Sequence, residues 1–336
     1  VYKRQGPGSW IAGSAILVLA VLLLVTATFA FARRPLLVDS VIQLFQARVF
    51  ASGQLYATAP PDEAFFAVQH MLVDGEKWYS QYPPGHSALL ALGVPLNAAW
   101  LVPVVLSLGT ALFIFGFVRR AYDRPTARLT LILLVAAPFF WFMGASHMNH
   151  VSALFFVSAF LYLLSRWQHE EGWLLLLGAG AAIGGAFLSR PLTAAAVGLA
   201  FTPFVLGTAR DRRELISIAA GAAGAALAVA AYVGYNAATT GEPFLPGYIK
   251  LWGPDHGLGF HSTPWGDIHT PLAGLRNELT DLTLLSGLLL EWPVPALIPA
   301  GLLFAAGWGN ASWDRRLLVA FLALPAAYIL YWHRDA

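Results

Sequence analysis

Long runs of hydrophobic residues, separated by short charged segments, follow one another along most of the chain. The first run, Trp10–Ala32, holds 23 residues without a charge; it is too long for a signal peptide and lacks the cleavage motif. Eight later runs are long enough to cross a bilayer, or nearly so: Trp100–Val118, Leu129–Ser146, Val151–Ser165, Trp173–Ser189, Pro191–Ala209, Leu215–Tyr235, Trp292–Trp308 and Leu317–Trp332. Because backbone polar groups in lipid must be satisfied internally, the pattern predicts an all-α integral membrane protein, a polytopic helix bundle of about nine spans.

The composition excludes several classes of protein. Apolar residues make up 58% of the chain and charged residues 11%, whereas soluble domains carry about 25% charged residues. A water-soluble fold could not bury that much apolar surface. A net charge of +2 is too small to indicate a nucleic-acid-binding protein. The absence of cysteine excludes disulfides, thiolate metal sites and a cysteine nucleophile. We expect one membrane domain over residues 1–336, truncated at both ends, since the chain opens on Val1 and stops soon after an apolar run.

The segments between the runs differ in charge. Twelve of the 20 basic residues lie at the N-terminus or in short loops on one side, which the positive-inside rule places in the cytoplasm. Two longer segments, 33–86 and 236–291, then face outward as extracytoplasmic loops that we expect to carry amphipathic helices. The outward side holds 12 of the 18 acidic residues and eight of the nine histidines. Any active site is therefore expected outside the cytoplasm, although these loops could also serve only to cap the bundle.

Asp39 is the first acidic residue of the outward side. It lies seven residues beyond the first run and is flanked by apolar residues. Partial desolvation there suits a general base, but an aspartate could equally cap the following helix, expected over Val41–Ala51. That helix is predicted to be amphipathic and to lie on the membrane surface, with Val41 on its apolar side and Gln43 and Gln46 elsewhere.

Two further motifs carry candidate substrate-binding residues. The segment Lys77–His86 combines aromatic residues with two prolines and a glycine, which suits a rigid turn at the membrane interface or a platform for a sugar ring. Its candidates are Tyr82 and His86, and the alternative is simple anchoring of the loop. His147 and His150 are three residues apart, a spacing that permits a metal site without specifying one. We favour polar contact with a substrate.

Arg190 lies between the apolar runs Trp173–Ser189 and Pro191–Ala209. A lipid phosphate is a natural partner for such a guanidinium, whereas snorkelling to ordinary head groups is the alternative. The second outward segment adds Lys250, His256 and His261 among aromatic residues and glycines. These residues are candidates for a lid over a substrate, or for inert packing.

Together these motifs resemble the GT-C glycosyltransferases, and they are most similar to the bacterial relatives of protein O-mannosyltransferases and the aminoarabinose transferase of lipid A. The resemblance rests on Asp39, Phe45–Gly53, Trp78–His86, Ser146–His150, Arg190-Pro191 and Thr240–Pro243. The family commonly has an acidic pair where this chain has Asp39-Ser40, so a metal site stays unassigned and a divalent metal is left open as a cofactor. Family members also carry more helices after the second outer loop, which fits truncation.

The resemblance implies a transferase that moves a sugar from a polyprenyl-phosphate donor to a lipid, glycan or protein acceptor. It places the protein in a bacterial inner membrane with the active site on the outer face, among membrane lipids and without nucleic acid. It also implies that Asp39 is the catalytic carboxylate and that Arg190 contacts the donor phosphate.

Two other functions are compatible with a polytopic membrane protein. A lipid or glycan transporter would need charged residues or broken helices inside its spans, and the predicted spans contain no Lys, Arg, Asp or Glu. A non-catalytic scaffold would leave Asp39 dispensable.

Overall fold

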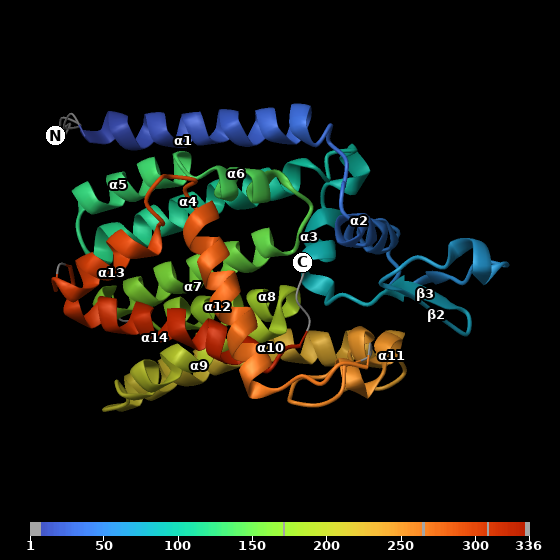
Figure 1. Cartoon of the computed structure of the whole chain (residues 1–336). Helices are drawn as coiled ribbons and strands as arrows, with labels where there is room; N and C mark the ends of the chain where they lie inside the picture. The colour runs from blue at the N-terminus through green and yellow to red at the C-terminus, as the bar shows by residue number, and fades with distance from the viewer. Residues whose placement is uncertain (1–7, 171, 264–265, 308, 333–336) are drawn as a thin grey trace.

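Seven helices run roughly along one direction and form the body of the molecule (Figure 1). The computed structural model describes residues 8–170, 172–263, 266–307 and 309–332. The seven helices are α1 (Gly8–Val25), α4 (Leu101–Ala121), α7 (His150–Glu170), α8 (Trp173–Ser189), α9 (Pro191–Leu206), α10 (Arg212–Thr239) and α14 (Ala311–Tyr328). Four helical stretches are long and apolar enough to cross a membrane: Trp10–Ala30, which joins α1 to the π-helical turn η1 (Thr26–Ala30), Leu101–Ala121, His150–Glu170 and Arg212–Thr239. The chain is therefore a mostly helical membrane protein.

Nine spans are not confirmed, because only four or five candidates occur in the described residues. The predicted span Leu129–Ser146 is two helices, α5 (Arg124–Val135) and α6 (Pro138–Ala145), bent by 67°. Pro138 disfavours the helical conformation at Ala137, which is extended here, and the chain turns between α5 and α6.

The predicted spans near the C-terminus also differ from the helices observed. In place of Trp292–Trp308, helix α13 (Leu297–Ala305) has nine residues, too few to cross a bilayer. Helix α14 begins ahead of the predicted run at Leu317 and includes a charged first turn. Helices α8 and α9 are apolar but have only 17 and 16 residues.

Small residues allow the central helices α8 and α10 to pack closely. A methyl group on Gly180 would overlap the backbone of Gly221, and one on Gly224 would overlap the backbone of Leu177. Aromatic side chains fill the space between α4, α7, α9 and α14, where Phe117 and Phe201 pack against Trp313. The helices are thus held by backbone approach on one side and by ring packing on the other.

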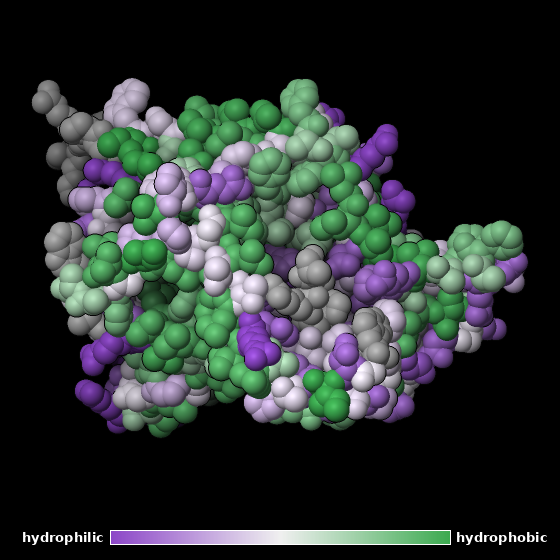
Figure 2. All heavy atoms as spheres, viewed as in Figure 1, coloured by the Kyte–Doolittle hydropathy of each residue, from purple (hydrophilic) through white to green (hydrophobic). Residues whose placement is uncertain are grey.

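The arginine-rich turns meet at one end of the bundle, which we call the arginine end. Arg120 and Arg166 both pair with Glu170, joining α4 to α7, and Tyr122 bonds to Asp314, joining α4 to α14. In Figure 2, hydrophobic side chains cover much of the bundle, and hydrophilic ones gather toward the ends.

The opposite end carries a small sheet and short helices, and we call it the cavity end (Figure 1). Its three-stranded antiparallel sheet has the order β1-β3-β2, with β1 (Ala57–Thr58), β2 (Met71–Asp74) and β3 (Lys77–Ser80). This end also holds α2 (Val38–Ala51), α3 (Pro84–Ala91), α11 (Gly247–Trp252) and the 3₁₀ turns η2 (Glu63–Phe66), η3 (Val94–Leu96) and η4 (Pro254–His256). Helix α12 (Pro271–Leu288) crosses the bundle (Figure 1). Both long segments, 33–86 and 236–291, contribute to this end.

Helix α2 corrects two predictions. It begins at Val38, and its N-cap residue Leu37 makes no side-chain cap, so Asp39 lies in the first turn and is not the cap. The predicted orientation is also wrong, because Val41 is half exposed while Gln43 and Gln46 are buried. Both glutamines can be buried because their side chains form hydrogen bonds inside the protein. Gln46 accepts from the backbone N–H of Ser80 in β3 and donates to the carbonyl of Leu55. Gln43 accepts from the Ser87 hydroxyl of α3.

Candidate functional site

A cavity of about 740 Å³ opens at the cavity end, between α2, the β2–β3 hairpin, α11, α12 and the junction of α8 with α9. It brings together five of the nine predicted site residues: Asp39, Tyr82, His150, Arg190 and His256. Polar side chains that were not predicted join them: Gln69, His70, Gln81, Asn149, Tyr248, Asn277, Glu278, Asp281, Tyr328 and Tyr331. Segments far apart in sequence therefore form one polar chamber.

Asp39 lies in the first turn of α2 at the edge of this chamber. Its Oδ1 atom is 3.6 Å from Nε2 of His70, and its side chain is 37% exposed, so solvent or a substrate can reach it. The N-terminal end of a helix stabilises an anion. Burial raises the pKa of the Tyr82 hydroxyl, and the charges of Tyr248 and Asp39 raise it further. Tyr82 therefore stays protonated next to the carboxylate and can donate a hydrogen bond.

Arg190 connects α8 to α9 in an extended conformation and directs its guanidinium into the chamber. Its Nη1 donates to Oδ1 of Asn149 at 3.2 Å and to Nε2 of His150 at 2.8 Å, and its Nη2 donates to the Tyr328 hydroxyl at 3.2 Å. Because arginine can only donate, Nε2 of His150 acts as the acceptor. Arg190 makes no ion pair with a described residue. The guanidinium is instead held by neutral side chains that line the chamber.

A second, apolar groove of about 570 Å³ adjoins the chamber. Its own lining is apolar and includes Phe187, Pro191, Leu192, Ala195, Ile249 and Leu258. Six residues line both spaces: Asn149, Arg190, Tyr248, His256, Tyr328 and Tyr331. The guanidinium thus stands where a polar chamber meets a groove suited to a hydrocarbon chain.

Helix α12 supplies an acidic wall that sequence reasoning missed. Glu278 and Asp281 are three residues apart, a spacing that puts both on one face of the helix, and both line the chamber. Burial, and to a smaller extent the charge of Asp281, raises the pKa of Glu278 to about 7. The sequence feature that could have identified them is the spacing of three between two acidic residues in the outward segment 236–291.

Two of the predicted histidines, His86 and His147, are buried away from the chamber. His86 is fully buried, with Nδ1 3.1 Å from the Ser152 hydroxyl and Nε2 2.9 Å from the carbonyl of His147. Burial lowers its pKa to about 4, so the neutral ring joins α3 to α7. His147 is also buried and lines a separate cavity of about 170 Å³. His147 and His150 therefore do not face one site, and no group of three or more possible ligands gathers in the described part of the chain.

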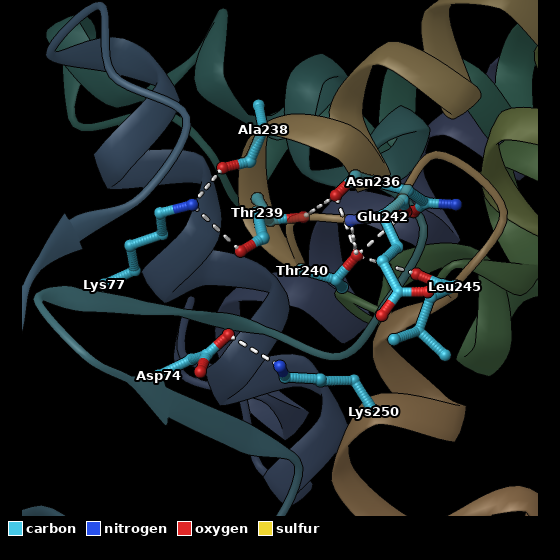
Figure 3. A network of polar contacts seen from close by, with 9 residues as sticks. All are labelled: Asp74, Lys77, Asn236, Ala238, Thr239, Thr240, Glu242, Leu245 and Lys250. Carbon is cyan, nitrogen blue, oxygen red and sulfur yellow. Dashed lines mark hydrogen bonds and ion pairs between the residues drawn. The ribbon is translucent and has the colours of Figure 1, made fainter.

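Lys250 and His261, the other two predicted residues, make contacts that hold the structure around the chamber; Figure 3 shows those of Lys250. Lys250 pairs with Asp74 of β2 at 3.0 Å, which fastens α11 to the hairpin. The ring nitrogens of His261 lie 2.8 and 2.9 Å from the carbonyls of Ser262 and Gly257 within its own loop. Neither residue lines the chamber, so the predicted lid role is not what these contacts indicate.

The hairpin is also fastened to the end of α10 (Figure 3). Lys77 donates to the carbonyl of Ala238 at 2.7 Å and to that of Thr239 at 3.4 Å, where a helix C-terminus favours a cation. The Thr240 hydroxyl oxygen lies 2.8, 3.1 and 3.0 Å from the carbonyl oxygens of Asn236, Glu242 and Leu245, and it can donate its hydrogen to one of them at a time. The Thr240–Pro243 motif is therefore a structural turn that positions α11.

Residues 82–235 match the family model described as dolichyl-phosphate-mannose-protein mannosyltransferase. The matched segment contains Tyr82, His150 and Arg190, whereas Asp39 lies ahead of it. No curated protein and no solved structure matches the chain. With the apolar helices, the match supports a membrane glycosyltransferase. It confirms the resemblance to GT-C glycosyltransferases that was drawn from the sequence.

Proposed function

We propose that this protein transfers a sugar from a polyprenyl-phosphate donor to the hydroxyl group of a lipid, glycan or protein. The observation that carries the proposal is the position of Arg190, which lines both the polar chamber and the apolar groove. An amphipathic donor with a charged head and a long hydrocarbon chain fits such a junction.

The donor phosphate would bind at Arg190. The guanidinium is held by three neutral partners and by no described carboxylate, so its charge is available to an anion. The fork of N–H groups matches phosphate oxygens, and Tyr328 and His150 fix the orientation of that fork. The isoprenoid chain would then lie along Pro191, Leu192 and the other apolar residues of the groove.

The acceptor hydroxyl would approach from the side of Asp39. In the transfer, the acceptor oxygen forms a bond to the anomeric carbon while its proton passes to the Asp39 carboxylate. The bond between that carbon and the phosphate oxygen breaks, and its electron pair leaves with the polyprenyl phosphate. Arg190 stabilises this departing charge. Attack from the side opposite the leaving group inverts the anomeric configuration.

The chamber would open on the extracytoplasmic face of a bacterial inner membrane. The arginine end carries most of the basic turns, and the positive-inside rule places that end in the cytoplasm. A polyprenyl-phosphate sugar exposed on the outer leaflet could then enter the groove laterally.

Binding of the donor tests the proposal directly. Purified protein in liposomes is mixed with a short-chain polyprenyl-phosphate sugar, and both binding and transfer to an acceptor hydroxyl are measured. Arg190→Ala is expected to weaken donor binding by more than tenfold, and Arg190→Lys is expected to restore only part of it because the bidentate geometry is lost. Arg276→Ala is the matched control, since Arg276 is exposed on α12 and does not line either space.

Donor binding by Arg190→Ala at the wild-type level would contradict the assigned phosphate site. Absence of transfer by the wild-type protein with every polyprenyl-phosphate sugar tested, despite specific binding, would favour a carrier of such lipids.

A further inference from the structure

A chain of three polar side chains leads from α11 to Asp39 across the hairpin. The indole Nε1 of Trp252 donates to Oε1 of Gln81 at 2.8 Å. Nε2 of Gln81 lies 2.8 Å from Nδ1 of His70, whose Nε2 faces Oδ1 of Asp39 at 3.6 Å. All four residues line the chamber.

The direction of donation along this chain follows from its first member. An indole N–H can only donate, so the oxygen of the Gln81 amide must face Trp252 and its NH₂ group must face His70. Nδ1 of His70 therefore accepts, and the proton of the neutral ring is on Nε2, the atom that faces Asp39. The contact of Trp252 with Gln81 thus determines which ring nitrogen of His70 carries the proton.

The hairpin explains why His70 and Gln81 meet. Met71 pairs with Ser80 in the antiparallel ladder, so the next positions outward are His70 and Gln81, and the backbone N–H of Gln81 donates to the carbonyl of His70 at 3.1 Å. His70 adopts φ +71°, in the left-handed region that a non-glycine residue seldom occupies. Such a conformation costs free energy and persists where the surroundings enforce it, often at functional sites.

Helix α11 fixes the other member of the pair. A Cβ atom on Gly247 would lie 2.7 Å from the carbonyl oxygen of Gln81 and 2.8 Å from its Cα. The start of α11 therefore lies directly on the backbone of Gln81, and Trp252 at the end of the same helix reaches its side chain. The network is rigid because two elements hold it.

We propose that His70 is the positioning residue of the base Asp39, with its tautomer set by Gln81 and Trp252. This inference rests on the proposed function, in which Asp39 takes the acceptor proton. The Nε2–H of His70 donates to one carboxylate oxygen, which leaves the other oxygen directed at the acceptor hydroxyl. Because Nε2 carries the proton, His70 is not itself the base. The 3.6 Å separation is longer than a hydrogen bond, and catalytic hydrogen bonds often tighten only when substrate binds.

Substitution of His70 gives the first test. His70→Ala is expected to lower kcat by about 10- to 100-fold with little change in the KM for the donor, by analogy with the loss of groups that orient catalytic ligands. His70→Gln retains an amide N–H that can reach Asp39, so it is expected to recover a large part of the rate. His169→Ala, an exposed histidine at the arginine end, is the matched control and should behave as wild type.

Gln81→Glu tests the tautomer itself. A carboxylate at position 81 accepts a hydrogen bond from a protonated Nδ1 of His70, so Nε2 either loses its hydrogen or the ring becomes a cation. This variant is expected to lose kcat although His70 is still present, and to show an altered dependence of kcat on pH. Nitrogen NMR of the labelled His70 ring should report Nε2–H in the wild type and a protonated Nδ1 in Gln81→Glu.

The double variant distinguishes the failure of this inference from failure of the proposed function. If His70 acts through Asp39, His70→Ala should cost almost nothing further in an Asp39→Asn background. Full activity of Asp39→Asn would overturn the proposed base. A dead Asp39→Asn together with fully active His70→Ala would overturn only the role of His70. Equal losses in His70→Ala and His70→Gln, with a lowered unfolding temperature in both, would reduce His70 to a structural residue and overturn the inference.

Discussion

The two ends of the bundle use charge in different ways. At the arginine end, Arg120 and Arg166 share the carboxylate of Glu170, so opposite charges meet directly. At the cavity end, Asp39 and Arg190 line the same chamber and make no ion pair with each other. Arg190 is held by neutral groups instead.

This difference separates charges that complete the structure from charges that are available to a ligand. A pair that is already satisfied gains little from a bound ion, whereas a guanidinium surrounded by neutral partners gains a strong partner when a phosphate binds. Glu278 and Asp281 of α12 also face the chamber together, and the charge of Asp281 adds to the effect of burial in raising the pKa of Glu278. The cavity end is therefore where a charged substrate has the largest effect.

Labelling the two ends should give the largest contrast, because each site is either accessible or not. The chain contains no cysteine, so single substitutions report cleanly. Gln54→Cys and Asp255→Cys are expected to react with an impermeant thiol reagent added to intact cells, and Arg210→Cys only after lysis. The reverse pattern would invert the assigned sides of the membrane.

Loss of the proposed base should have the next largest effect. Asp39→Asn keeps the size of the side chain and removes its basicity, so kcat is expected to fall by about 10²- to 10⁴-fold with nearly unchanged donor binding. Transfer in proteoliposomes measures the rate, and Asp267→Asn at an exposed position is the control. Turnover close to that of wild type would remove Asp39 from the mechanism.

Glu278 predicts a pH dependence of stability at the cavity end. Burial and Asp281 raise its pKa to about 7, above its ordinary value of 4.5, so the folded protein favours the protonated form. The stability that this proton contributes is present below about pH 4.5 and is lost as the pH rises through about 7. Glu278→Gln stays neutral, so its unfolding temperature should exceed that of wild type increasingly between pH 5 and pH 8.

The exposed Glu63 provides the control for that series, and Glu63→Gln should follow wild type at each pH. A constant difference between Glu278→Gln and wild type across the pH range would contradict an ionisation at Glu278.

Breaking a pair at the arginine end should have the smallest effect. Arg166→Ala removes one of two arginines from a solvent-exposed carboxylate, and exposed pairs of this kind contribute little to stability. Its unfolding temperature and sugar transfer are expected to match wild type within error. A large loss of transfer would show that the two ends are coupled.

The sequence predicted the class of structure and the most conspicuous members of the site. Hydrophobic runs are a property of local composition, so the helical membrane protein could be predicted from them. Asp39 and Arg190 were found because a charge next to an apolar run is conspicuous. The match over residues 82–235 supports the resemblance drawn from the same motifs.

The rest of the site could not be read from spacing alone. His70 and Gln81 belong to ordinary polar stretches, and their meeting depends on the register of β2 with β3. His86 and Lys250 stood out as polar residues near aromatics, yet each is used inside the fold, His86 between α3 and α7 and Lys250 on Asp74. A histidine or lysine in a loop looks the same in sequence whether it faces a cavity or a neighbouring helix.

The amino-acid sequence by itself determined that the chain is a helical membrane protein with its basic residues concentrated in short turns. Those properties depend on the transfer of each segment between water and lipid, which is a sum over residues that are neighbours in the chain. Only the tertiary structure decided where the membrane helices break, which face of α2 is buried and which side chains share the chamber. These depend on contacts between segments as distant as Asp39, Arg190 and Glu278, and such contacts are fixed by packing and by hydrogen-bond satisfaction, not by local composition.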